Sequence, residues 1–392
     1  MICKDNHNTD SLSPQVIFLL FINLSHAVGG IFLMSAVCGL ISIPIILNFC
    51  KAKKLYDLPN ARKIHHNAIP RLGGIAFIPS MFLSFAIVIA IISSTEKLIV
   101  INLWTIYFLI SMLLIYGMGI IDDVIGLSAM VKFVIQIVAA CFIPLSGLYI
   151  NNLYGFCGIG EIPYLIGFPL TVLTIVFIDN AINLIDGIDG LAASLSIIAL
   201  SGFLYIFITQ EVWAYSILIA GLIGVLVAFL YFNLFGSIEK NRKIFMGDAG
   251  SLTLGFFLGF LCIKYTMQNP SVILEHKYNF LMAFTLLLVP MFDVIRVFMA
   301  RIYHHKSPFS PDKTHIHHKL MASGLSQHQA LGFIITIALF YILLNGTLLT
   351  VLNSTITFAI DIVIYIFINL ILNFSIAKKK AIRDEDNVAK AA

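Results

Sequence analysis

Five short segments of this chain gather the residue types that act on charged substrates: Asp, Asn, His, Lys and Arg. Their ranges are 57–74, 122–132, 183–190, 245–251 and 301–318. Carboxylate and amide oxygens are ligands that suit a divalent cation, whereas Lys, Arg and His donors suit phosphate oxygens. The five segments together therefore indicate chemistry on a charged substrate.

Two adjacent carboxylates, Asp122 and Asp123, stand at the predicted end of an apolar helix. Such a pair opposes the helix dipole, and its two charges repel each other. Adjacent carboxylates can bind a divalent cation, or one can serve as a general base beside the other. Lys132, at the start of the next predicted helix, could then contact a phosphate. A solvated helix terminus is the structural alternative.

The segment 179–190 holds three Asp and two Asn between apolar residues. It does not match an EF-hand loop, because it lacks the alternate oxygen ligands and the closing Glu. Asn183 and Asp186 are three residues apart and share one face of a helix, and Gly187 and Gly190 let the backbone turn close to a ligand. We therefore expect this segment to bind a ligand.

A single carboxylate, Asp248, lies between Gly247 and Gly250 at the predicted start of a helix. Asp is a good helix N-cap, and the amides at a helix N-terminus attract phosphate. The two roles are compatible. We expect Asp248 to hold Mg²⁺ while the helix amides face phosphate oxygens.

Three histidines, His315, His317 and His318, follow one another in the largest predicted inner loop. A zinc site is one interpretation, but no Cys is nearby and the neighbouring Lys and Arg would repel a cation. An anion fits the surroundings better, because His, Lys and Arg donors together can clamp a diphosphate.

The composition is that of a membrane protein, with 59% hydrophobic residues, 11% charged residues and a mean hydropathy of +0.97. A soluble domain carries roughly a quarter charged residues. Crossing the hydrocarbon core takes about 17–25 apolar residues. The sequence predicts an all-α polytopic protein with about eleven such helices, at 25–49, 72–92, 99–121, 129–145, 164–177, 191–209, 212–235, 252–267, 280–300, 330–351 and 355–376.

The basic residues predict the orientation of these helices. If the segment after the first helix faces the cytoplasm, every Lys and Arg lies inside except Lys4, Lys97, Lys264 and Lys277. The positive-inside rule then places the N-terminus outside, the C-terminus in the cytoplasm and all five polar segments on the inner face. We divide the chain into an N-terminal tail with a short apolar segment (1–24), a transmembrane domain (25–377) and a charged cytoplasmic tail (378–392).

Other features have simpler interpretations. The apolar stretch 15–24 is only about ten residues long, the segment before it carries Lys4 against Asp5 and Asp10, and no small-residue cleavage site is evident. We therefore expect it to extend the first helix or lie at the interface rather than to be a removable signal peptide. Gly255 and Gly259 are expected to allow close helix packing, and the cysteines to pack in apolar surroundings. No nucleic-acid signature is present. A transporter is disfavoured, because it would need ionisable residues along a path near the bilayer midplane.

Five motifs follow one another along the chain: Asp57-Leu-Pro-Asn-Ala-Arg-Lys-Ile-His65 with Pro70-Arg-Leu-Gly-Gly74, Asp122-Asp123, Asn183-Leu-Ile-Asp-Gly-Ile-Asp-Gly190, Phe245-Met-Gly-Asp248 and His315-Ile-His-His318. In type and order they resemble the motifs of the polyprenyl-phosphate N-acetylhexosamine-1-phosphate transferases, most closely the WecA/TagO-type branch. The resemblance covers roughly residues 40–320.

The resemblance implies transfer of a sugar 1-phosphate from a UDP-N-acetylhexosamine to undecaprenyl phosphate, with release of UMP. This is the first membrane step of cell-envelope polysaccharide synthesis. It implies Mg²⁺ as cofactor, with Mn²⁺ as an alternative, and a bacterial inner membrane location with the active site on the cytoplasmic face. The lipid bilayer is a further partner, and a homodimer is one option. N-acetylglucosamine is the expected sugar. Other UDP-N-acetyl sugars and UDP-MurNAc-pentapeptide are alternatives, the last being disfavoured by the 307–313 lead-in to the His motif.

The resemblance also implies residue roles. Asp122 and Asp123 correspond to the catalytic pair, with Asp122 as base or as an orienting group for the lipid phosphate, and Asn183 and Asp248 correspond to Mg²⁺ ligands. Substrate contacts are implied for Lys132 (phosphate), for Asp189 and Phe245 (uracil), and for His315, His317 and His318 (diphosphate or sugar). Asp186 is a further expected substrate-binding residue.

Overall fold

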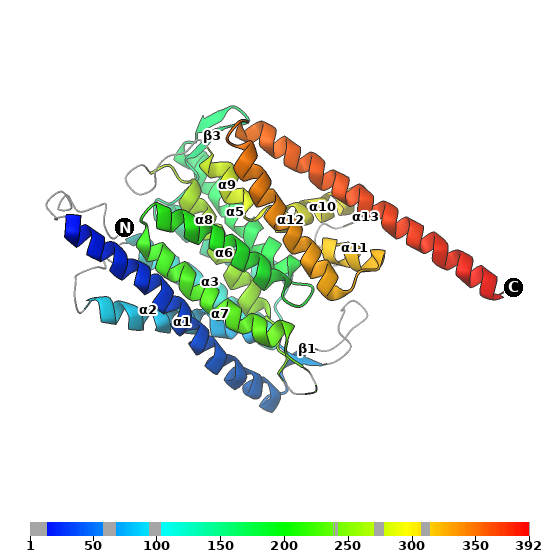
Figure 1. Ribbon diagram of the computed structural model, residues 1–392, viewed down its shortest axis with the longest axis horizontal. Coiled ribbons are helices and arrows are strands. Elements are labelled where there is room, and N and C mark those ends of the chain that lie inside the picture. Colours follow the sequence, from blue (N-terminus) through cyan, green and yellow to red (C-terminus); the bar gives the residue numbers. More distant parts are fainter. Residues whose placement is uncertain are drawn as a thin grey trace.

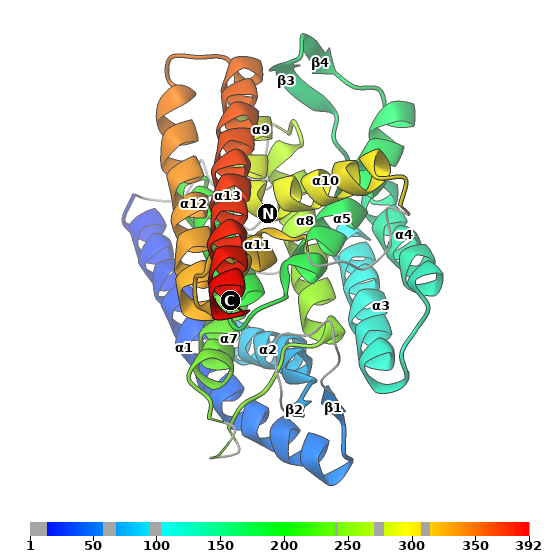
Figure 2. The same cartoon turned by 90° about the vertical axis from the view of Figure 1, so that its right-hand side faces the viewer.

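The computed structural model describes residues 14–57, 68–93, 103–237, 239, 242–269, 278–306 and 314–391. Most of the first polar motif, 58–67, and the 307–313 lead-in to the His motif lie outside these residues. The described chain is mostly helical (Figures 1 and 2). The helices are α1 (Pro14–Ala52), α2 (Phe77–Ser93), α3 (Leu103–Ile125), α4 (Ala129–Leu145), α5 (Tyr164–Ile185), α6 (Leu191–Thr209), α7 (Trp213–Leu234), α8 (Asp248–Thr266), α9 (Asn279–Thr285), α10 (Leu288–Tyr303), α11 (Ile316–Ser323), α12 (Gln327–Leu348) and α13 (Ser354–Ala391), with a 3₁₀ turn η2 (Gly73–Ala76).

Two small antiparallel hairpins depart from the all-α expectation. One pairs β1 (Tyr56–Asp57) with β2 (Ile69–Pro70), and the other pairs β3 (Asn152–Phe156) with β4 (Ile159–Glu161). They lie at opposite ends of the helix bundle in Figures 1 and 2. Strands this short leave no period in the hydropathy, so a search for long apolar runs cannot detect them.

Within the described residues, eight helices are long and apolar enough to cross a membrane, and a ninth span results if α9 and α10 count as one. The polytopic membrane class is therefore confirmed. Two shorter apolar helices, Gly73–Val88 and Ala129–Leu145, coincide with two more of the eleven predicted spans.

The span predicted at 280–300 is broken, because α9 and α10 meet at an angle of 77°. Pro290 accounts for the break. It has no N–H to donate to the carbonyl of Leu286, and its ring would clash with that carbonyl in a continuous helix. The chain therefore turns at Leu286 and Leu287, and α10 takes a new direction.

Helix α8 is the centre of the bundle. All of its residues except Asp248 are buried, and α3, α5, α6 and α9 pack against it. A Cβ on Gly255 would lie 2.6 Å from Cα of Asp179, and one on Gly259 would lie 3.3 Å from Cα of Ile175. The two glycines therefore permit the close approach of α5, as predicted.

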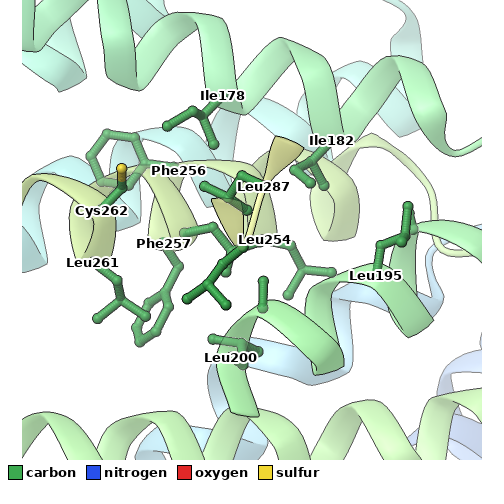
Figure 3. Close-up of a cluster of buried hydrophobic side chains, with 14 of the residues drawn as sticks. Ile178, Ile182, Leu195, Leu200, Leu254, Phe256, Phe257, Leu261, Cys262 and Leu287 are labelled. Atoms are coloured by element: carbon green, nitrogen blue, oxygen red, sulfur yellow. The ribbon is translucent and has the colours of Figure 1, made fainter. Parts of the chain in front are cut away.

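Figure 3 shows the apolar core that holds α8 in place. Phe256, Phe257 and Leu261 of α8 lie among Ile178 and Ile182 of α5 and Leu195 and Leu200 of α6. Contacts from several helices fix α8 both along its axis and in rotation, because close-packed side chains leave little room for sliding. The first residue of α8, Asp248, is thereby placed with precision.

Two helix boundaries differ from the predictions. The predicted helix at 164–177 continues to Ile185, because Gln136 of α4 donates to Asp179 Oδ2 (3.0 Å) and accepts from Asn180 Nδ2 (3.0 Å) inside the bundle. The charged tail predicted at 378–392 continues α13 as helix through Ala391, and α13 projects beyond the rest of the molecule in Figure 1. At the other end, α1 begins at Pro14, so the stretch 15–24 extends the first helix.

Candidate active site

The start of α8 rests on the Pro70–Gly74 motif. The backbone N–H of Phe245 donates to Pro70 O, and those of Gly73 and Gly74 donate to the carbonyls of Phe245 and Met246. A Cβ on Gly74 would overlap the backbone of Gly250. The glycines of this motif therefore let the chain preceding α8 lie directly against η2, which positions Asp248.

Asp123 caps α8 from a different helix. Its carboxylate accepts hydrogen bonds from the backbone N–H groups of Asp248 (2.9 Å) and Ala249 (2.9 Å). Gly247, the N-cap residue, has φ +75°, and a Cβ there would lie 2.5 Å from Asp123 Oδ2. A negative group at a helix N-terminus satisfies free N–H groups and the helix dipole. Asp123 thus links the end of α3 to the start of α8.

The expectation that the α8 amides face phosphate is wrong. The N–H groups of Asp248 and Ala249 are taken by Asp123, and those of Gly250 and Ser251 donate to Gly247 O. The backbone N–H groups of residues 248–251 therefore all have protein partners. A phosphate at this site must be held by side chains or by a cation.

Lys132 joins the two carboxylates that face each other across the site. Its Nζ lies 3.0 Å from Asp122 Oδ2 and 2.9 Å from Asp248 Oδ2. Ser128 caps α4 by accepting from Val131 N, which puts Lys132 in the first turn. The other oxygen of Asp122 accepts from Leu127 N at 2.6 Å. Asp122 therefore accepts a backbone hydrogen bond at the end of α3 and also contacts the ammonium group of Lys132.

Asn183, in the last turn of α5, completes this group. Its Nδ2 donates to Asp248 Oδ1 (3.3 Å) and to Ser251 Oγ (2.9 Å). The carbonyl oxygen of Asn183 and the carboxylate of Asp248 are hard oxygen ligands on adjacent side chains. Mg²⁺ is usually held by one or two such protein ligands together with water and substrate phosphates. The pair fits Mg²⁺.

The rest of the Asn183–Gly190 motif follows the end of α5. Asp186 is half-buried, and burial together with the carboxylates of Asp248, Asp189 and Asp123 raises its pKa to about 7. Burial is the largest cause of this upward shift, and the three neighbouring carboxylates add to it by an electrostatic contribution that a dication would reverse. The donor set therefore also fits Mg²⁺ on electrostatic grounds.

Asp189 forms an ion pair with Lys243. The ammonium of Lys243 contacts Asp189 Oδ2 (2.7 Å) and Asn233 O (2.6 Å), while Asn233 Oδ1 accepts from Gly190 N (2.6 Å). Gly190 has φ +74°, a conformation that suits glycine. Phe245 is half-buried next to this network.

The three histidines are not equivalent. His315 Nδ1 lies 2.7 Å from Oδ2 of Asp293 in α10. His317 is buried, and burial with the nearby His318 lowers its pKa to about 3, so its ring is neutral. A Cβ on Gly187 would overlap the His317 ring. The His motif therefore lies against the Asn183–Gly190 motif, and His317 does not contribute a cation to a clamp.

The structure brings together four predicted residues, Asp122, Lys132, Asn183 and Asp248, in direct contact. The sequence reasoning missed Lys243, Asn233 and Asp293. Asp293 did carry a signal, because a carboxylate in an apolar helix with Arg296 three residues later suggests a paired internal charge.

Comparisons with known proteins identify relatives of this chain. The family model described as Glycosyl transferase family 4 matches residues 105–266. A Bacillus subtilis (strain 168) protein, called a probable undecaprenyl-phosphate N-acetylglucosaminyl 1-phosphate transferase, is 34% identical over 78% of this chain and 82% of its own length.

Undecaprenyl-phosphate alpha-N-acetylglucosaminyl 1-phosphate transferases from Yersinia pestis and Escherichia coli (strain K12) are each 30% identical. They cover 70% and 71% of this chain, and 72% and 73% of their own lengths. The matched lengths include α3, α4, α5 and α8, which carry the contacts around Asp248. The chain belongs to glycosyl transferase family 4, among the WecA/TagO-type sugar-1-phosphate transferases.

Proposed function

We propose that this protein transfers N-acetylglucosamine 1-phosphate from UDP-N-acetylglucosamine to undecaprenyl phosphate, giving undecaprenyl-diphosphate-N-acetylglucosamine and UMP. The names of the relatives indicate the reaction. The observation that carries it in this chain is the contact of Lys132 with both Asp122 and Asp248, next to Asn183. Phosphoryl transfer depends mainly on positioning and on neutralising charge, and this group supplies both.

In the proposed site, Asn183 and Asp248 hold Mg²⁺. The bound ion would neutralise the donor diphosphate and polarise the phosphorus that is attacked. Mn²⁺ suits the same oxygen ligands. Ser251 supports the arrangement, because its hydroxyl accepts the Asn183 amide and so fixes which way the Asn183 carbonyl points.

Lys132 and Asp122 act on the other side of Asp248. The ammonium of Lys132 donates to phosphate oxygens once substrates bind, because it is half-buried and already lies between two carboxylates. Asp122 orients Lys132 and the phosphate of undecaprenyl phosphate, or it accepts a proton from that phosphate. Asp123, whose two oxygens are occupied by α8 amides, contributes by positioning Asp248.

The donor nucleoside and sugar occupy the flanking motifs in this proposal. Asp189 and Phe245 bind uracil, with Lys243 holding the Asp189 carboxylate in place. Asp186 and the histidines face the diphosphate or sugar. His317 lies there as a neutral ring against Gly187, and His315 and His318 make polar contacts with the substrate.

The membrane arrangement is also proposed. Within the described residues, nine spans, with α9 and α10 counted as one, and the two shorter apolar helices add up to eleven crossings. With an odd number, the N-terminus lies outside and the C-terminus lies in the cytoplasm of the bacterial inner membrane. The site then opens at the cytoplasmic face, where a soluble UDP-sugar and a membrane-bound polyprenyl phosphate can both reach it. A homodimer in the bilayer is part of the same proposal.

The test is a membrane assay with undecaprenyl phosphate and a panel of UDP-sugars, in which UMP release and the lipid product are measured. We expect turnover with UDP-N-acetylglucosamine and little with UDP-MurNAc-pentapeptide. Membranes that carry the Asp248→Asn variant serve as the control. Turnover with another UDP-sugar alone would replace the sugar in this proposal, and no UMP release with any donor would overturn the reaction.

A further inference from the structure

A buried carboxylate outside the proposed site residues, Asp293 of α10, ties three helices together. Its Oδ2 lies 2.7 Å from His315 Nδ1, and its Oδ1 accepts from Ile316 N (2.9 Å) and from Arg296 Nη2 (2.7 Å). The hydroxyl of Tyr365 in α13 approaches Oδ1 at 3.5 Å. Asp293 itself is 0% exposed.

These contacts determine where α11 begins. His315 is the N-cap residue of α11, but its side chain makes no capping hydrogen bond. Asp293 accepts the first N–H of the helix in its place, and Arg296 donates to the carbonyl of Thr314 just before it. The Asp293–Arg296 pair therefore fixes the backbone on both sides of His315.

The same contact determines the tautomer of His315. A carboxylate facing Nδ1 requires that this nitrogen carries the proton, so Nε2 is the ring nitrogen left for a substrate. The His315 ring lies parallel to the His317 ring, with centroids 5.9 Å apart and 5° between the planes. His317 in turn covers Gly187 beside Asp186. Asp293 thus determines the orientation and the protonated nitrogen of the His315 ring, which lies beside the proposed diphosphate and sugar region.

We propose that Asp293 is a positioning residue that acts through His315: it holds the imidazole in the orientation and tautomer that present Nε2, as a hydrogen-bond acceptor, to a hydroxyl or amide N–H group of the UDP-sugar. The identity of that substrate rests on the proposed function, whereas the orientation of His315 does not. A residue that only anchors α11 would support the fold equally well with any hydrogen-bond acceptor at this position.

Asp293→Asn separates these two roles. The Asn carbonyl can still accept from Ile316 N, but its amide would face His315 Nδ1 as a donor and favour the opposite tautomer. Asp361→Asn is the matched control. Asp361 is also 0% exposed, lies in α13 and accepts from Asn345 Nδ2 (2.9 Å) without contacting a histidine.

The first measurement is a double-mutant cycle on kcat/KM with UDP-N-acetylglucosamine. We expect Asp293→Asn to lower kcat/KM by roughly 10–100-fold in the wild-type background, as for residues that orient a ligand through a histidine. In the His315→Ala background, Asp293→Asn should change kcat/KM by no more than about twofold. The control Asp361→Asn should also change kcat/KM of the wild type by no more than about twofold. Multiplicative losses for Asp293→Asn and His315→Ala would overturn the proposal.

The second measurement needs no turnover. In nitrogen-15 histidine-labelled enzyme, with the His315 signals assigned from His315→Gln, the ring shifts should report a proton on Nδ1 in the wild type and on Nε2 in Asp293→Asn. The same tautomer in both proteins would overturn the proposal. Absence of UMP release from the wild type would instead count against the proposed reaction and leave this readout to decide the role of Asp293.

Discussion

The carboxylate of Asp123 accepts a hydrogen bond of 2.9 Å from the backbone N–H of Asp248, so the second member of one acidic motif caps the helix that begins with another. Asp122, its neighbour in sequence, instead contacts Lys132. The two adjacent carboxylates therefore have different tasks. Asp123 fixes the start of α8, and Asp122 contributes negative charge beside Lys132.

This difference predicts distinct effects for the two substitutions. Asp123→Ala leaves two amide donors at the start of α8 without an acceptor, which should cost about 1–3 kcal/mol of stability. Asp122→Ala should lower kcat with a smaller effect on stability. Thermal unfolding in detergent and UMP release measure the two quantities. Equal loss of thermal stability in both variants would contradict the assignment.

Asp248→Asn should abolish turnover while the protein remains folded in the membrane, because an amide replaces the one charged oxygen ligand of the proposed Mg²⁺ site. Removal of divalent cations with EDTA should stop the wild-type reaction, and added Mg²⁺ should restore it. Near-normal activity of the variant at saturating Mg²⁺ would exclude the metal role of Asp248.

Lys132→Ala should lower kcat/KM for the UDP-sugar by about 10- to 150-fold, the effect of losing a charge-assisted hydrogen bond of roughly 1.5–3 kcal/mol. Lys378→Ala, which removes an exposed lysine from α13, is the control and should leave the rate unchanged. If kcat/KM of Lys132→Ala equals that of the control, Lys132 does not contact the substrate.

Two glycines on α3 offer a matched test of the close packing at the site. A Cβ on Gly119 would lie 2.5 Å from Cα of Ala249, whereas one on Gly117 would have no atom within 4 Å. Gly119→Ala should therefore displace the start of α8 and reduce both activity and thermal stability. Gly117→Ala should preserve activity and slightly stabilise the helix. Identical behaviour of the two variants would show that α8 tolerates displacement.

Eleven crossings predict that a tag after Ala392 is protected from impermeant reagents in intact cells, whereas a tag at Met1 is accessible. The physical reason is the concentration of Lys and Arg on one side. Labelling of intact and permeabilised cells distinguishes the two locations. Labelling of both tags from the same side would require an even number of spans.

Much of the fold could be predicted because long apolar runs identify membrane helices without tertiary information. The bounds of α6 were predicted without error, at 191–209. The errors arose where tertiary contacts override local pattern. Asp179 marks no helix end, because Gln136 satisfies it inside the bundle. Pro290 breaks an apolar run that looks continuous.

The site, too, could be predicted only in part. The contact of Lys132 with Asp248 could be expected, because both residues were placed at the inner ends of predicted helices. The partners of Asp123 and His315 could not be predicted. They are a backbone amide on α8 and a carboxylate inside α10, and no spacing rule relates residues on different helices.

The contact between Gly187 and the His317 ring has a consequence for biogenesis. It joins the end of α5 to α11, which lies far later in the chain, so the contact forms only after most helices have been synthesised and inserted. A nascent chain that ends before α11 contains the acidic group around Asp248 but lacks the histidines beside Gly187. Activity should therefore emerge late in synthesis and in a single step, which prevents a half-inserted chain from consuming the lipid carrier.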